Sequence, residues 1–103
     1  MNYQLITNTD ELRKAIETLT SQPVVGLDTE TTDLDPFTAR LRLIQLATPD
    51  RVYIVDFDHF SNGNADAIAP LRRLLEAPRP IKIAHNAKFD AKFIKHNLGV
   101  DLG

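Results

Sequence analysis

Two acidic side chains two positions apart form the first candidate site. Asp28 and Glu30 end an apolar run at 24–27, and strand side chains alternate, so we expect both carboxylates on one face, about 7 Å apart. Carboxylate oxygens are hard ligands suited to Mg²⁺ or Mn²⁺. A pair of such ions can activate water and stabilise a leaving oxygen on phosphorus. The alternative is a pair of solvated acids at a strand end.

A third acid follows another apolar segment. Asn86 can cap a helix, and Asp90 lies four residues on, on the same side of that helix. A right-handed crossover would place the strand at 81–84 beside the strand at 23–28 and bring Asp90 to the first pair. Asp90 could instead pair with a nearby lysine. Lys88 and Lys92 fit phosphate contacts and ordinary surface lysines equally well.

Other kinds of site find little support. The chain has no cysteine, which excludes disulfides, thiolate metal ligands and a cysteine nucleophile. Its histidines, His59, His85 and His96, lack metal-ligand spacing. The sequence contains no nucleophile elbow, no P-loop and no glycine-rich dinucleotide motif. A metal would therefore depend on oxygen ligands.

The composition describes one soluble domain. The chain has 103 residues, 43% hydrophobic and 25% charged, with a formal net charge of -2. Residues 79–103 hold 5 Lys or Arg against 2 Asp or Glu, whereas residues 1–78 hold 7 against 12. A basic segment beside acids fits a metal site for a polyanion, or a solvated helix face. The N-terminal segment lacks the pattern of an export signal, and no apolar run could span a membrane, so we expect a cytoplasmic protein without membrane partners.

The elements that must position these residues follow from periodicity. Strands are expected at 3–6, 23–28, 41–48, 51–57 and 81–84, and helices after Asn8, around 68–75 and from 86 to 98. Residues 29–38 are expected to form a loop and 61–64 a turn. Pro70 leaves the start of the middle helix open. Asn8 and Glu11 have capping-box spacing, and Gly99 is expected to end the last helix.

These elements predict a mixed α/β domain. The strands at 23–28, 41–48 and 51–57 are expected to form an antiparallel meander, since short turns join the last two. The strand at 81–84 would then join in parallel, followed by the last helix. The chain ends directly after that helix.

Two segments carry a family resemblance. The sequences VVGLDTETTDLDP at 24–36 and IAHNAKFDAKFI at 83–94 resemble the first and second motifs of the DEDD 3′–5′ exonucleases. This family includes ribonuclease D and the proofreading domain of family A DNA polymerases. LRLIQLA, running into VYIVDF, looks closer to ribonuclease D. The resemblance covers about residues 22–98 and implies a ribonuclease H-like fold.

The resemblance also implies roles for single residues. Asp28, Glu30 and Asp90 match the catalytic carboxylates that hold two Mg²⁺ or Mn²⁺ ions. Thr31 and Leu34 match positions that contact the terminal nucleotide. Asn86 and Lys88 match residues that hold substrate or orient the site. The implied activity is removal of nucleoside monophosphates from 3′ ends of single-stranded DNA or RNA.

The third family motif, a tyrosine followed by an aspartate, is absent. Tyr3 and Tyr53 lack the right context, and Asp58 precedes the second motif. We therefore expect residues 1–103 to form a C-terminally truncated exonuclease domain, inactive or very weak alone, which self-associates through an exposed sheet edge. A truncated, non-catalytic nucleic-acid-binding or interaction module is the alternative. A haloacid-dehalogenase-like phosphatase with Asp28 as nucleophile is a third reading, which Glu30 disfavours.

Overall fold

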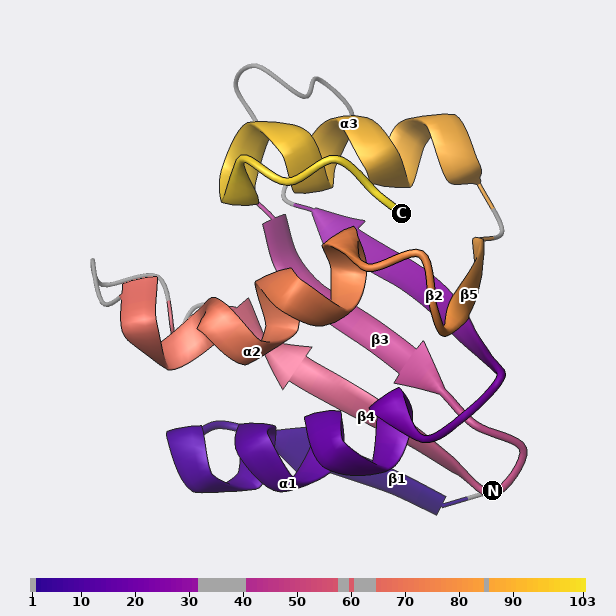
Figure 1. Ribbon diagram of the computed structural model, residues 1–103. Helices are drawn as coiled ribbons and strands as arrows, with labels where there is room; N and C mark the ends of the chain where they lie inside the picture. Colours follow the sequence, from indigo (N-terminus) through magenta and orange to yellow (C-terminus); the bar gives the residue numbers. More distant parts are fainter. Residues whose placement is uncertain (1, 32–40, 58–59, 61–64, 85) are drawn as a thin grey trace.

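A five-stranded mixed sheet carries three helices on one of its faces (Figure 1). The computed structural model describes residues 2–31, 41–57, 60, 65–84 and 86–103. The strands are β1 (Asn2–Ile6), β2 (Val24–Thr31), β3 (Leu41–Ala47), β4 (Arg51–Asp56) and β5 (Ile81–Ala84). The helices are α1 (Thr9–Thr20), α2 (Ala65–Glu76) and α3 (Ala87–Leu98).

The strand order is β1-β4-β3-β2-β5. β2, β3 and β4 pair antiparallel, which confirms the predicted meander. β5 pairs in parallel with β2, with Val24 opposite Ile81, which confirms the predicted neighbourhood. β1 pairs in parallel with β4 at the other edge, a contact that local patterns did not predict. The mixed α/β domain is therefore as expected, with one additional parallel pair.

β2 is longer than its sequence pattern suggested. The prediction that a loop begins at Thr29 is wrong, because the strand continues to Thr31 and stays paired with β3. The Thr29 side chain is buried like Val25 and Leu27 before it, so the buried side of the strand includes a polar residue. This extension keeps Asp28 and Glu30 within the part of β2 that is paired with β3, and the register shifts directly after Glu30.

The first helix begins as predicted. Asn8 accepts a hydrogen bond from the Glu11 backbone N–H at 2.9 Å, and its amide donates to the Glu11 carboxylate at 2.8 Å. The two residues thus satisfy each other at the start of α1. The buried side chains of the helix form one apolar stripe at i, i+3, i+4 and i+7: Leu12, Ala15, Ile16 and Leu19.

The other two helices differ from expectation at their starts. Pro70 is the sixth residue of α2 and does not lie in the first turn. Asn86 stands at the N-cap of α3 but makes no side-chain capping hydrogen bond. Gly99 ends α3 in the left-handed conformation at φ 69°, as its position predicted.

The three helices leave the second face of the sheet open. Ile6, Val25, Leu27, Ile44, Leu46 and Val55 point to the helices and are buried. Strand alternation and the register place Tyr3, Leu5, Val24, Ile81 and Ile83 on the other face. These five are the exposed large hydrophobic residues of the described segments. We call this second surface the open face.

Several expected features lie outside the described residues. These are the loop at 32–38, the turn at 61–64, Leu34, His59 and His85. Within the described ranges, no helix has the length and apolar character needed to cross a membrane.

Candidate functional site

Asp28 and Glu30 both lie exposed on the open face of β2. Asp28 pairs across the sheet with Gln45, and Glu30 with Leu43. The expectation that the two carboxylates share one face is therefore confirmed. The Thr29 backbone N–H donates to Asp28 Oδ1 at 2.9 Å, which holds one carboxylate oxygen close to the strand.

A shallow hollow of about 330 Å³ lies beside Asp28 on the open face. It is lined by Gly26, Leu27, Asp28, Gln45, Ala47, Val52 and Ile83. Two small residues form its floor: a Cβ added at Gly26 would come within 3.4 Å of the Ala47 Cβ. The Asp28 carboxylate thus borders a recess that a ligand can enter from solvent.

Asp90 has a different environment from the exposed pair. It lies in the first turn of α3, is 1% exposed, and accepts a hydrogen bond from Thr29 Oγ1 at 2.5 Å. Thr29 points to the helix side of β2, opposite to its neighbours Asp28 and Glu30. Among the described residues, no three acidic or histidine side chains form a group able to hold a metal ion. The structure therefore brings Asp90 to the strand of the exposed pair without joining it to their carboxylates.

Three of the residues with expected substrate contacts are described, and they lie at the end of β2 and the start of α3: Thr31, Asn86 and Lys88. Thr31 is half-buried and follows an irregularity in the β2–β3 register, where Glu30 faces Leu43 and Thr31 faces Leu41. Such a bulge redirects the side chains at a strand end. Leu34 lies outside the described residues.

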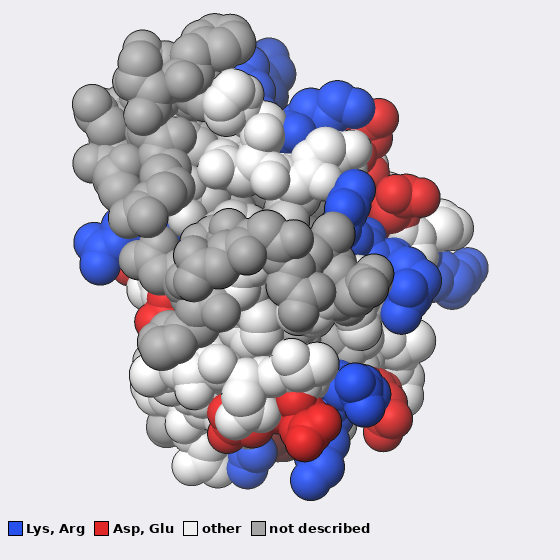
Figure 2. Space-filling view, turned by 90° about the vertical axis from the view of Figure 1, so that its left-hand side faces the viewer, with Lys and Arg blue, Asp and Glu red and all other residues white. Residues whose placement is uncertain are grey.

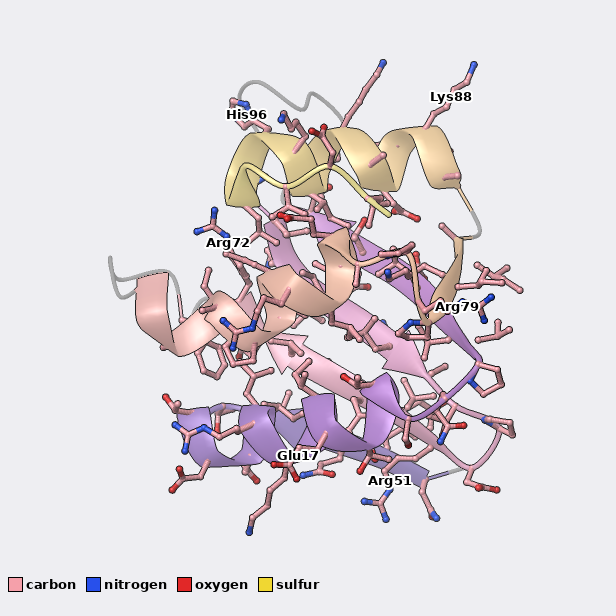
Figure 3. All side chains as sticks on the ribbon, viewed as in Figure 1. Glu17, Arg51, Arg72, Arg79, Lys88 and His96 are labelled. Carbon is pink, nitrogen blue, oxygen red and sulfur yellow. The ribbon has the colours of Figure 1, made fainter. Side chains whose placement is uncertain are left out.

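Asn86 and Lys88 are both exposed. Lys88 projects from the start of α3, away from the sheet (Figure 3). In Figure 2, Lys and Arg side chains gather on the right-hand side of the view, which is the side of the helices. Acidic side chains such as Glu17 are also exposed on the helix side, whereas Asp28 and Glu30 lie on the open face.

One further titratable group is perturbed. Lys82 of β5 points to the helix side, and its ammonium donates a hydrogen bond to the Ala77 carbonyl. Loss of water around this side chain lowers its pKa from the usual 10.5.

Sequence reasoning missed Thr29 as a site residue because it assigned the position to a loop. The available signal was alternation: a residue between two outward-pointing acids of one strand must point inward. A threonine at this position brings a hydroxyl to the helix-facing core. A buried carboxylate from α3 needs a hydrogen-bond donor there, and the hydroxyl supplies it.

The donor chemistry of the exposed pair fits a divalent cation. Two carboxylates on one strand face offer hard oxygen ligands, with open solvent for the water ligands that Mg²⁺ retains. We find no cationic side chain hydrogen-bonded to either carboxylate among the described contacts. Asp28 and Glu30 are thus the residues that could hold a metal.

Comparison with known proteins gives one family model and several relatives that match nearly the whole chain. The model of a family described as 3′–5′ exonuclease matches residues 3–103. DNA polymerase I of Aquifex aeolicus is 35% identical over 94 residues, which are 91% of this chain and 14% of that protein. Ribonuclease D of Gluconacetobacter diazotrophicus is 34% identical over 95 residues, which are 92% of this chain and 23% of that protein.

A solved structure shows the same fold. The crystal structure of Escherichia coli RNase D, an exoribonuclease involved in structured RNA processing, matches with a TM-score of 0.82 and 28% identity. The match covers 99% of this chain and 26% of that one. The chain thus spans about a quarter or less of the length of these relatives. The likeness confirms the predicted ribonuclease H-like fold.

Proposed function

Since the chain belongs to the 3′–5′ exonuclease family, we propose that it removes nucleoside monophosphates from the 3′ ends of DNA or RNA as part of a metal-dependent exonuclease domain. Asp28, Glu30 and Asp90 are its catalytic carboxylates in this proposal. By this proposal the 103 residues alone have negligible activity, because the sequence lacks the tyrosine-aspartate motif that supplies the fourth carboxylate.

The observation that carries the proposal is the exposed pair of carboxylates on β2. Asp28 and Glu30 are solvent-accessible in regular strand, beside a recess on the open face. Solvated surface acids that serve no ligand would not require a strand extended to Thr31 or an inward threonine between them. Both features fit a site whose ligands are held by the sheet.

Asp28 and Glu30 would hold divalent ions, Mg²⁺ or Mn²⁺, and Asp90, whose carboxylate is buried on the helix side of β2, is proposed as the third carboxylate on the family motif. When bound, two such ions supply a water activated for attack on phosphorus and stabilise the leaving oxygen. The protein's own part is to hold these carboxylates: the Thr29 N–H fixes one oxygen of Asp28, and the Thr29 hydroxyl fixes one oxygen of Asp90.

The substrate in this proposal is a single-stranded 3′ end. Lys88 is exposed at the start of α3, where an ammonium can attract phosphate. Thr31 and Leu34 would contact the terminal nucleotide, and Asn86 would hold substrate or orient the site. The family resemblance implies few base contacts, so sequence specificity is not expected.

The family assignment leaves no support for a phosphatase with Asp28 as nucleophile. A non-catalytic module that binds nucleic acid remains the rival of the proposed exonuclease. It predicts oligonucleotide binding that does not depend on Asp28.

Mn²⁺ binding tests the proposal directly. The wild-type chain should bind Mn²⁺ weakly, measured through the electron paramagnetic resonance signal of free Mn²⁺, and Asp28→Ala should abolish binding. Glu17→Ala on α1 is the matched control, since it removes an equally exposed carboxylate on the helix side and should leave binding unchanged. Equal Mn²⁺ binding by wild type and Asp28→Ala would overturn the assignment.

A further inference from the structure

We infer that Thr29 is a positioning residue for this site: its hydroxyl holds the Asp90 carboxylate and so fixes the start of α3 against the strand that carries Asp28 and Glu30. The inference rests on the proposed function. It concerns a residue that touches neither substrate nor metal and acts through Asp90.

The position of the pair supports this role. Thr29 and Asp90 are 8% and 1% exposed, and they are the two buried polar side chains of the described segments. Their hydrogen bond joins residues 61 positions apart, from β2 to α3. The two oxygen atoms are 2.5 Å apart, which is a short hydrogen bond.

Stability alone gives a poor reason for this pair. Burying a carboxylate costs free energy, and an apolar pair of similar volume would pack here at no such cost. The surrounding core consists of apolar side chains such as Leu27, Phe93 and Ile94. A buried carboxylate that loses its hydrogen bond costs free energy. The pair therefore favours the one arrangement of β2 and α3 in which Thr29 and Asp90 meet.

This contact joins the first turn of α3 to β2. Asn86 makes no side-chain cap, although its carbonyl accepts the Asp90 N–H at 2.9 Å. Thr29 therefore ties the first turn to the sheet. A second tether lies at the far end of the helix, where Asn97 Oδ1 accepts the Leu41 N–H at 3.4 Å and Asn97 Nδ2 donates to the Phe93 carbonyl.

The two tethers allow a controlled experiment. Thr29→Val removes the hydroxyl and keeps the shape, Thr29→Ser keeps the hydroxyl, and Asn97→Ala removes the distant tether. Mn²⁺ affinity is measured for each variant by electron paramagnetic resonance, and stability by urea unfolding. We expect Thr29→Val to weaken Mn²⁺ binding about 10-fold or more, as loss of a ligand's supporting hydrogen bond commonly does. Thr29→Ser should rescue binding, and Asn97→Ala should lower stability with Mn²⁺ affinity unchanged.

The outcomes separate this inference from the proposed function. If Thr29→Val binds Mn²⁺ as wild type does while Asp28→Ala does not, Thr29 is not a positioning residue and the proposed site stands. Equal losses in Thr29→Val and Asn97→Ala would show general loosening of α3 and also refute the inference. If wild type binds no Mn²⁺, the proposed function fails and the inference with it. Should Thr29→Val not fold, Thr29→Ala replaces it.

Discussion

Tyr3 and Ile83 stand at opposite ends of one row of side chains that crosses the whole open face. The register places Val52, Ala47 and Gly26 between them, one residue from each inner strand. Tyr3 is 66% exposed and Ile83 62%, whereas the middle of the row is made of small or covered residues. The row is therefore shallow in its middle and has an exposed apolar side chain at each end. We call these ends, Tyr3 and Ile83, the rims of the row, which lies next to Asp28.

The rims should make the isolated chain self-associate. An exposed apolar surface of more than a few hundred Å² favours contact with other molecules, and β5 is also an unpaired sheet edge. We expect the apparent mass in sedimentation velocity to rise with concentration. Leu5→Lys with Ile83→Lys should suppress this rise, whereas Lys substitutions at two exposed helix-side positions, Thr18 and Glu76, should not. A monodisperse wild-type monomer would contradict the expectation.

Lys88 and Lys92 should contribute to nucleic-acid binding through charge. Both are exposed on α3, so a phosphodiester backbone could approach them. Each phosphate contact on a single strand releases about 0.7 counterion, so charge reversal of both lysines should lower the salt slope of oligonucleotide binding by up to about 1.4. Fluorescence anisotropy across a salt series measures this slope. Reversal of Lys14 and Arg73 is the matched control, and an unchanged slope in the Lys88 and Lys92 variant would assign these lysines to a solvated surface.

Gly99→Ala should destabilise the chain. Gly99 has φ 69°, where a Cβ costs about 1–2 kcal/mol, and its N–H closes α3 on the Lys95 carbonyl at 2.8 Å. Gly26→Ala is the matched control because its backbone is not left-handed and its added Cβ meets Ala47 at 3.4 Å. Urea unfolding should show a loss at Gly99 and a change below about 1 kcal/mol at Gly26. Equal effects would mean that the cap conformation contributes nothing.

Lys82 should give stability an alkaline dependence. Its folded pKa is lowered by loss of water, so between that pKa and 10.5 the unfolded chain binds more protons than the folded chain. The contribution of this group to the free energy of unfolding therefore rises as pH increases through this window. Lys82→Met should remove that rise, and Lys14→Met should retain it. Urea unfolding at several pH values from neutral to 10 measures the difference between the three proteins.

The sequence was sufficient to predict features set by local pattern. Alternation placed Asp28 and Glu30 on one face, and turn chemistry predicted the β3–β4 hairpin. The handedness of crossovers predicted β5 beside β2. Each of these depends on neighbours in sequence or on a general rule of chain connection.

Features that depend on distant partners were not predictable. Asn2 pairs with Arg51, 49 positions away, and nothing in residues 2–6 specifies β4 as their neighbour. β2 continues through Thr29, whose hydroxyl donates to the buried carboxylate of Asp90. A threonine between two acids is locally typical of a loop, and the hydrogen bond that its hydroxyl makes is to a residue of α3, 61 positions away.

The open face also affects how the chain should unfold with heat. The heat capacity change of unfolding arises chiefly from apolar surface that is newly wetted, roughly 12–15 cal/mol/K per residue for an ordinary domain. Side chains such as Leu5 and Ile83 are already largely wetted in the native sheet, so they add little to this change. Calorimetry of the monomer should therefore give a heat capacity change below the ordinary value for 103 residues, with a correspondingly flatter stability curve. A molecule that covers the open face should raise the heat capacity change of unfolding, because these side chains would then be wetted only when the complex unfolds.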